Sequence, residues 1–222
     1  MYINNRFILK PDFHNLGELG LDYKDLLTYI TIRSFYNSNS KYCYPGYRAI
    51  SKLSGLSPYF IGKSVKRLNE AGILTVWKVG KLRKANWYMF DNAAGLNKIS
   101  YELLKDSDLS SNEKSVLILL SEYCKHGYCA ESIADIADKA GVSFKVLNQH
   151  YQALRLKGYI SESMHEDCLS GTLTKHFALT NMLQWDMRQY TPACPKVEDS
   201  PIEKVLNIIQ DHMRLRVMAA RQ

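Results

Sequence analysis

The sequence lacks the features that mark membrane and secreted proteins. It contains no run of 18 apolar residues, the length that a helix needs to span a bilayer. Near its start only Phe7-Ile8-Leu9 form an apolar run, which is too short for the core of a signal peptide. We therefore expect a cytoplasmic protein.

The cysteines form no regular pattern. There are five, an odd number, and in a reducing compartment they are expected to be ordinary thiols. Cys124, His126 and Cys129 could supply three zinc ligands, but a zinc site needs a fourth. The same residues can simply pack where a helix ends. The sequence therefore predicts no metal and no cofactor.

The sequence also lacks the usual signatures of catalysis. It has no Gly-rich phosphate loop followed by Lys-Ser/Thr, and no Gly-x-Ser-x-Gly. The histidines are scattered without a His-x-His pair, and the carboxylates show no grouping that suggests two-metal chemistry. We expect that the chain is not an enzyme.

Acidic residues are scarce in one part of the chain. Residues 41–84 contain ten Lys or Arg but a single acid, Glu70. Residues 1–97 carry 14 basic and 6 acidic residues, whereas residues 98–222 carry 15 and 16. A purely solubilising surface would mix both signs, so this concentration indicates phosphate binding.

The basic stretch also contains the start and end signals of two helices joined by a tight turn. Gly55 marks the turn, Ser57 can cap the second helix, and Pro58 suits its first position. Gly72 suits its end, because a residue without Cβ can take a left-handed conformation. Spacings of four and three place three apolar residues on one face of this helix: Ile61, Val65 and Leu68.

A β-hairpin is predicted directly after this helix. Residues 75–79 are predicted as an alternating strand and residues 86–90 as a second strand, and a basic turn from Gly80 to Ala85 joins them. Before the turn at Gly55, a helix is predicted from Asp22 with Phe35 on its apolar side, followed by a short strand at residues 42–44. The whole arrangement resembles the winged helix-turn-helix family of DNA-binding proteins.

The resemblance implies roles for individual residues. In this family the second helix lies in the major groove and the wing touches the adjacent backbone. The residues expected to face base edges are Tyr59, Phe60, Lys63 and Lys66, although Phe60 could instead pack beneath the wing. The residues expected to contact phosphates are Arg48, Lys52, Ser57, Arg67, Lys78, Lys81, Arg83 and Lys84.

The pattern occurs a second time, 86 residues later. Gly141-Val142-Ser143 matches Gly55-Leu56-Ser57 at that offset, and Gly158 matches Gly72. Ser110 and Glu113 form a capping box before the corresponding first helix. We therefore predict an α+β fold, mostly α, with two tandem winged helix-turn-helix domains. The first, basic domain spans residues 1–97, the second, acidic domain spans 98–190 with a hairpin turn at residues 168–171, and a hinge with a C-terminal amphipathic helix spans 191–222. Residues 91–99, where the strand alternation stops, are expected to form a linker.

The second domain differs from the first in charge. Residues 100–190 hold nine basic and twelve acidic residues, so the cationic surround that supplies most DNA affinity is missing. Its candidate base readers are Lys145, Asn148, Gln149 and Gln152, but a contact with a replication or transcription protein is an equal alternative. The C-terminal helix could dock on this domain or pair with a second copy in a homodimer.

Two functional hypotheses follow. The first is a double-stranded DNA-binding protein, sequence-specific, acting in replication initiation or transcriptional regulation. Residues 43–47, 63–68 and 71–74 are similar to the helix-turn-helix modules at the front of phage and plasmid replication proteins. The alternative is a winged-helix adaptor that docks proteins within a nucleoprotein assembly and has little DNA affinity of its own.

Overall fold

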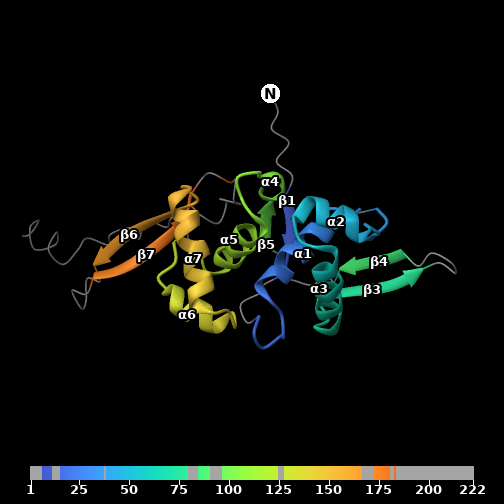
Figure 1. Cartoon of the computed structure of the whole chain (residues 1–222), viewed down its shortest axis with the longest axis horizontal. Coiled ribbons are helices and arrows are strands. Elements are labelled where there is room, and N and C mark those ends of the chain that lie inside the picture. The colour runs from blue at the N-terminus through green and yellow to red at the C-terminus, as the bar shows by residue number, and fades with distance from the viewer. Residues whose placement is uncertain are drawn as a thin grey trace, which may run out of the picture. The chain divides into compact units, whose positions relative to one another are not determined.

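The computed structural model describes residues 7–11, 16–37, 39–79, 85–90, 97–124, 128–166, 173–180 and 183. These residues belong to one compact unit that spans residues 1–189. The predicted hinge and C-terminal helix, residues 191–222, lie outside the described residues. Helices and strands are both present in the described part, which confirms the predicted α+β class (Figure 1).

The first half of the unit begins with the helix that the sequence predicted. The Asp22 carboxylate caps α1 by accepting a hydrogen bond from the N–H of Lys24 at 2.8 Å. The Asp25 carboxylate in turn accepts one from the N–H of Asp22, also at 2.8 Å. The chain leaves the helix at Ser34, so the expectation for Phe35 is wrong: it lies beyond the helix and is 40% exposed. The elements in order are β1 (Phe7–Lys10), α1 (Tyr23–Arg33), β2 (Tyr42–Cys43), α2 (Tyr47–Ser54), α3 (Pro58–Glu70), β3 (Leu74–Val79) and β4 (Ala85–Phe90).

Three of these strands form one antiparallel sheet in the order β2-β4-β3. Leu74 of β3 lies opposite Phe90 of β4, and both are buried. Tyr88, the next inward residue of β4, lies opposite Cys43 of β2 and is buried as well. One side of the sheet therefore covers the hydrophobic core, as strand alternation requires.

The second half repeats much of this order. Ser110 and Glu113 form the predicted capping box, with the Ser110 N–H donating to Glu113 Oε2 at 2.7 Å. Gly141 turns the chain between the next two helices with a φ of 64°, close to the 75° of Gly55. The hairpin turn expected at residues 168–171 lies outside the described residues. The elements are β5 (Asn97–Ser100), α4 (Glu102–Lys105), α5 (Ser111–Tyr123), α6 (Ile133–Lys139), α7 (Phe144–Leu156), β6 (Ile160–Glu166) and β7 (Leu173–Leu179).

The two halves share one hydrophobic core. α1 packs against α5, and β1 pairs with β5 in antiparallel register. Residues 116–120 of α5 are all fully buried, so this helix is enclosed on every side rather than on one stripe. A buried ion pair between Lys10 of β1 and Glu122 of α5 adds a polar link between the halves.

Strand β5 corrects the predicted linker. The linker was expected at residues 91–99, of which 91–96 lie outside the described residues. Residues 97–99 belong to β5 and pair with β1 instead. The prediction was wrong there because a strand this short has no periodicity to detect, and its partner is distant in the sequence. The predicted boundary between residues 97 and 98 falls inside this strand.

Candidate nucleic-acid interface

The turn between α2 and α3 is built as the sequence predicted. Gly55 ends α2 in the left-handed conformation, which a residue without Cβ adopts without strain. Ser57 then caps α3, its Oγ accepting the N–H of Phe60 at 3.2 Å, and Pro58 takes the first helical position. These local contacts fix the point at which α3 leaves the turn.

The inner side of α3 is closely packed. Ile61, Val65 and Leu68, the predicted apolar stripe, are all buried. Gly62 lies against Tyr47 of α2, and a Cβ at this position would be only 3.4 Å from the Tyr47 ring. The missing side chain therefore permits a close approach of the two helices, at the cost of a residue with low helix propensity.

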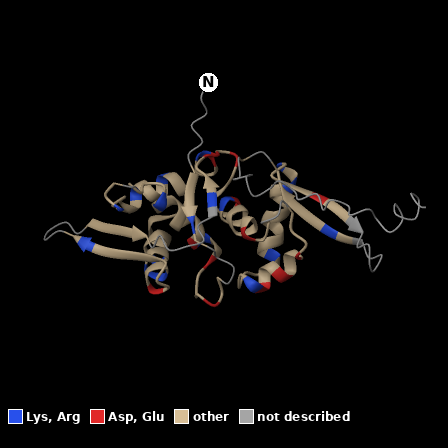
Figure 2. Ribbon diagram, turned by 180° about the vertical axis from the view of Figure 1, so that it is seen from behind, with Lys and Arg blue, Asp and Glu red and all other residues tan. Residues whose placement is uncertain are grey.

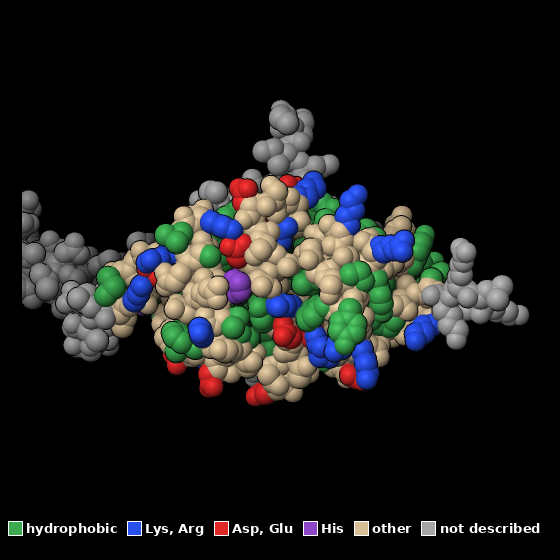
Figure 3. All heavy atoms as spheres, viewed as in Figure 1, with side chains coloured by type: hydrophobic (Ala, Val, Ile, Leu, Met, Phe, Trp, Pro, Cys, Tyr) green, Lys and Arg blue, Asp and Glu red, His purple; other side chains and the backbone are tan. Residues whose placement is uncertain are grey.

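The outer side of α3 is exposed and cationic. Tyr59 is 73% exposed, and the Lys63 Nζ lies 4.5 Å from the centroid of its ring. Lys66 faces Glu70 across one helical turn at 3.6 Å, with both side chains exposed. Exposed pairs of this kind contribute only about 0.3–0.5 kcal/mol, so they leave the lysine available to a ligand. Figure 3 shows Lys and Arg side chains gathered over this helix.

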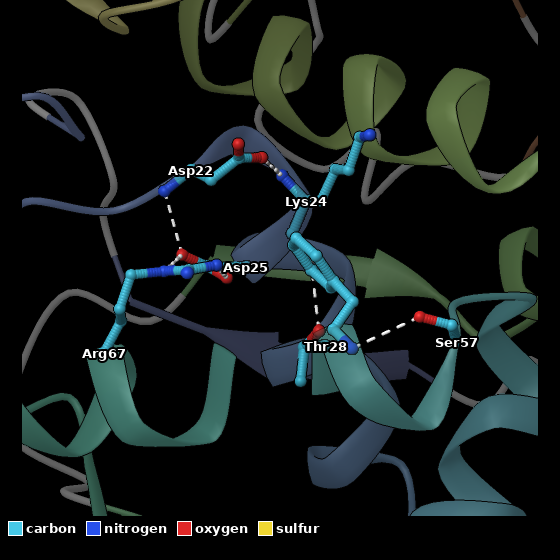
Figure 4. A network of polar contacts seen from close by, with 7 residues as sticks. Asp22, Lys24, Asp25, Thr28, Ser57 and Arg67 are labelled. Carbon is cyan, nitrogen blue, oxygen red and sulfur yellow. Dashed lines mark hydrogen bonds and ion pairs between the residues drawn. The ribbon is translucent and has the colours of Figure 1, made fainter. Parts of the chain in front are cut away.

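Arg67 does not belong to that outer side, because its guanidinium points to Asp25 (Figure 4). The Nε and Nη2 atoms of Arg67 donate to the two carboxylate oxygens of Asp25 in α1, each at 2.7 Å. These hydrogen bonds raise the pKa of Arg67, and Asp25 is fully buried. Phe60 is half-buried, and the Arg67 guanidinium lies 5.3 Å from its ring centroid.

This geometry bears on the roles expected for Arg67 and Phe60. Arg67 was expected to contact phosphate, but its guanidinium is held by a buried carboxylate on α1. Phe60 was expected to face bases or to pack beneath the wing; it packs beside Arg67 and Lys24, whose Nζ lies 6.0 Å from its ring centroid. In the sequence Asp25 is marked only as the third residue after the helix start at Asp22, so no local pattern linked Arg67 to α1.

The other expected phosphate contacts lie on α2 and on the hairpin. Arg48 and Lys52 of α2 are exposed, as is Lys78 near the end of β3. Figure 2 shows Lys and Arg spread over α2, α3 and the end of β3, whereas the second half mixes both signs. The remaining three expected residues, Lys81, Arg83 and Lys84, lie outside the described residues.

The corresponding helix of the second half presents a different surface. On α7, Lys145 and Gln149 are exposed, whereas Asn148 and Gln152 are half-buried. The Gln152 Nε2 donates to the Asn148 Oδ1 at 3.4 Å, so these two amides partly satisfy one another. The four candidate readers therefore lie along one helix, but only two of them are fully accessible.

The second hairpin is attached to α7 through Glu162 of β6. Its carboxylate accepts hydrogen bonds from Tyr151 at 2.8 Å, Arg155 at 2.7 Å and Lys175 at 2.8 Å. Burial raises the pKa of Glu162, but the bonds from Lys175, Arg155 and Tyr151 outweigh it and lower the pKa to about 2. No local pattern in the sequence marks this cluster, because its members are spread over three elements.

The helices α3 and α7 flank the central helix pair. α3 packs on α1 and α7 packs on α5. Lys24, at the start of α1, lies near Phe60 of α3, and its charge also affects the pKa of His150 of α7. Burial is the largest influence and lowers the pKa of His150; the charge of Glu113 raises it, and the charge of Lys24 lowers it. Lys24 was not predicted as part of the site, because its sequence context marks it only as the first turn of a helix.

The comparison with known families bears on this geometry. Residues 19–74 match the family model of the helix-turn-helix domain. The matched range runs from the approach to α1 through the Gly55 turn and α3 to the first residue of β3. A match to this domain supports DNA binding by the first half. A comparison with proteins of curated function found no significant match.

Within the described ranges, no three His, Cys, Asp or Glu side chains come together as metal ligands. Cys124 and Cys129 are buried thiols, while His126 falls in the undescribed segment between them. In the same ranges, no helix has the length and apolar character to cross a membrane.

Proposed function

We propose that this chain binds double-stranded DNA, with sequence preference, through its helix-turn-helix domain. The observation that carries the proposal is the division of α3 into two sides. Its apolar stripe is buried, while Tyr59, Lys63 and Lys66 point to solvent with no other part of the described chain covering them. The second helix of such a domain enters the major groove, where lysine can donate to guanine and an aromatic ring can lie against a thymine methyl.

In this proposal the remaining cations hold the sugar-phosphate backbone. Arg48, Lys52 and Lys78 are exposed around α3. The hydroxyl of Ser57 uses its oxygen as the cap of α3 and keeps its hydrogen for a phosphate oxygen. The β3–β4 hairpin acts as the wing, with Lys81, Arg83 and Lys84 in its turn. Arg67 and Phe60 take no direct part.

We further propose that the second half is a second winged helix, related to the first by an approximate two-fold axis. The packing of α1 on α5 and the antiparallel pairing of β1 with β5 support this, because each brings an element of one half together with the corresponding element of the other. A single chain would then meet two half-sites in opposite orientation, with the second half contributing less affinity.

The biological role that fits best is replication initiation or transcriptional regulation on a phage- or plasmid-type element. It rests on the similarity of residues 43–47, 63–68 and 71–74 to the front modules of such replication proteins. The proposal is for a binding protein in the cytoplasm, without catalysis and without a cofactor. Its further partner is a second copy through the C-terminal helix, or a replication or transcription protein through the second half.

The salt dependence of duplex binding tests the central claim. The affinity of the full chain for a pool of duplexes would be measured as salt is raised. A plot of log affinity against log salt should fall with a slope reflecting roughly four to eight phosphates. A weak affinity with a flat response would reject DNA binding and favour the adaptor. Selection of bound duplexes from a random pool, followed by sizing of the complex, would give the target and the number of chains on it.

Two variants separate base reading from phosphate contact. Replacing Lys81, Arg83 and Lys84 with alanine should weaken binding to all sequences and reduce the salt slope by about three. Lys63→Ala should change the preference among sequences, by about 1–3 kcal/mol at the base pair it contacts. Lys105→Ala removes one exposed charge from the second half and serves as the control. Loss of discrimination to the same extent in both variants would contradict the assigned roles.

A further inference from the structure

The sheet β2-β4-β3 carries a group of aromatic side chains on the side away from the core. Trp77 of β3 and Trp87 of β4 are direct partners in the register, so their side chains lie on the same side. Tyr42 and Tyr44 are both stacked on Trp87, with ring centroids 4.5 and 5.6 Å from it. We name these four residues the aromatic face. Tyr88 and Phe90, which alternate with Trp87 along β4, are buried on the opposite side.

Packing within the sheet accounts for only part of this face. Cross-strand stacking stabilises a sheet, and it explains Tyr42 and Trp87, which are half-buried. It does not explain the outer members, because Tyr44 is 64% exposed and Trp77 is 46% exposed. An aromatic cluster kept in contact with water is typical of a binding surface.

The surroundings of the aromatic face indicate what binds there. The elements β2, α2, β3 and β4 contain no Asp or Glu at all, whereas Arg48, Lys52 and Lys78 are exposed on them. Tyr44 stands between two grooves, one of which is also lined by Arg48 and Asn86. Flat apolar rings next to cations match the chemistry of a nucleobase joined to a phosphate.

We propose that the aromatic face binds the unpaired bases of a DNA strand by stacking, with Tyr44 and Trp77 as the outer contacts. Bases inside a duplex already stack on their neighbours and offer no free ring face. This surface therefore takes single-stranded DNA, and it goes beyond the duplex contact of α3. Arg48 lies beside Tyr44 in the shared groove, where it can neutralise a phosphate of the bound strand.

The test measures the affinity of the full chain for two labelled probes, an oligothymidylate of about 16 nucleotides and a duplex selected for binding. The variant Tyr44→Ala/Trp77→Ala should bind the oligothymidylate roughly tenfold more weakly and leave duplex affinity unchanged. Tyr44→Phe/Trp77→Phe keeps the rings and should restore binding. Tyr128→Ala removes an exposed aromatic residue of the second half and is the matched control. Circular dichroism establishes that each variant is folded.

Three outcomes would overturn the proposal. The wild-type chain could fail to bind the oligothymidylate while binding duplex, or the alanine variant could bind it as tightly as the wild type. The alanine variant could also abolish a self-association of the wild-type chain, which would make the aromatic face an interface between copies. Because the duplex probe is measured in parallel, a failure of duplex binding is distinguished from a failure at the aromatic face.

Discussion

The carboxylate of Asp25 makes two separate sets of contacts. Its carboxylate closes the capping box at the start of α1, a contact made within three residues. The same carboxylate binds the guanidinium of Arg67, which is 42 residues away. A cap is visible in the sequence because it is local, whereas the ion pair exists only once α1 and α3 have packed together.

Loss of Arg67 should destabilise the protein more than loss of its neighbour. Arg67→Ala leaves a buried carboxylate without its cation, so the free energy of unfolding should fall by about 3 kcal/mol. Lys66→Ala, on the exposed side of the same helix, should change it by less than about 0.5 kcal/mol. Urea unfolding of both variants measures the difference. Similar losses would show that the Asp25–Arg67 pair is not what holds α3 on α1.

Glu162 should make stability depend on pH in the acid range. Its pKa is lowered to about 2 in the folded protein, while an unfolded glutamate titrates near its ordinary value of about 4.3. The stabilisation is therefore complete above about pH 4.5 and is lost as the pH falls through 2, on the order of 2 kcal/mol after allowance for solvent screening. Thermal unfolding of the wild type and of Glu162→Gln between these pH values should show a flatter dependence in the variant. Parallel curves would contradict this role for Glu162.

At the scale of the element, most helix starts were predicted, whereas the end of α1 was not. Starts are marked by caps whose partners lie three residues along the chain, as at Ser57 and Ser110. The end of α1 depends on where the chain turns toward β2, and nothing local at Phe35 showed that turn. Strand β5 was missed for a similar reason, because its hydrogen bonds go to β1.

The two matching serines offer a direct test of capping. The Ser57 hydroxyl accepts a backbone N–H at the start of α3, whereas Ser143, at the same place before α7, makes no such bond. Ser57→Ala should therefore reduce the free energy of unfolding by about 1 kcal/mol, and Ser143→Ala should have a much smaller effect. Chemical denaturation of the two variants provides the comparison. An equal loss at both positions would mean that the hydroxyl bond is not the cause.

At the scale of the whole molecule, the two halves are joined by their first long helices, α1 and α5, which pack against each other. α1 and α5 are enclosed on all sides, and each helps to cover the other. The repeat in the sequence predicted two similar halves but could not show that their first helices form a common core. Similarity of pattern gives the kind of element, while the choice of packing partner depends on which apolar surfaces meet.

A fragment that ends at residue 97 should not fold on its own. It would keep the predicted first domain but lose α5 and most of β5, so the apolar surface of α1 and the edge of β1 would be exposed to water. We expect no cooperative thermal transition for residues 1–97 and a single transition for residues 1–189. Scanning calorimetry of the two fragments tests this. A sharp transition of the short fragment would show that the first half is an independent domain.

The sequence by itself determined most of the helices and hairpin strands, the two turn–helix units with their glycines, the cap at Ser57, and the concentration of positive charge over residues 41–84. These features are encoded within a few residues of one another, so they can be recognised without the fold. Only the tertiary structure decided that Arg67 and Phe60 face α1, that Tyr59, Lys63 and Lys66 remain exposed, and that β1 joins β5. Each of these depends on contacts between segments far apart in the chain, whose side chains are brought together by burial of the shared core.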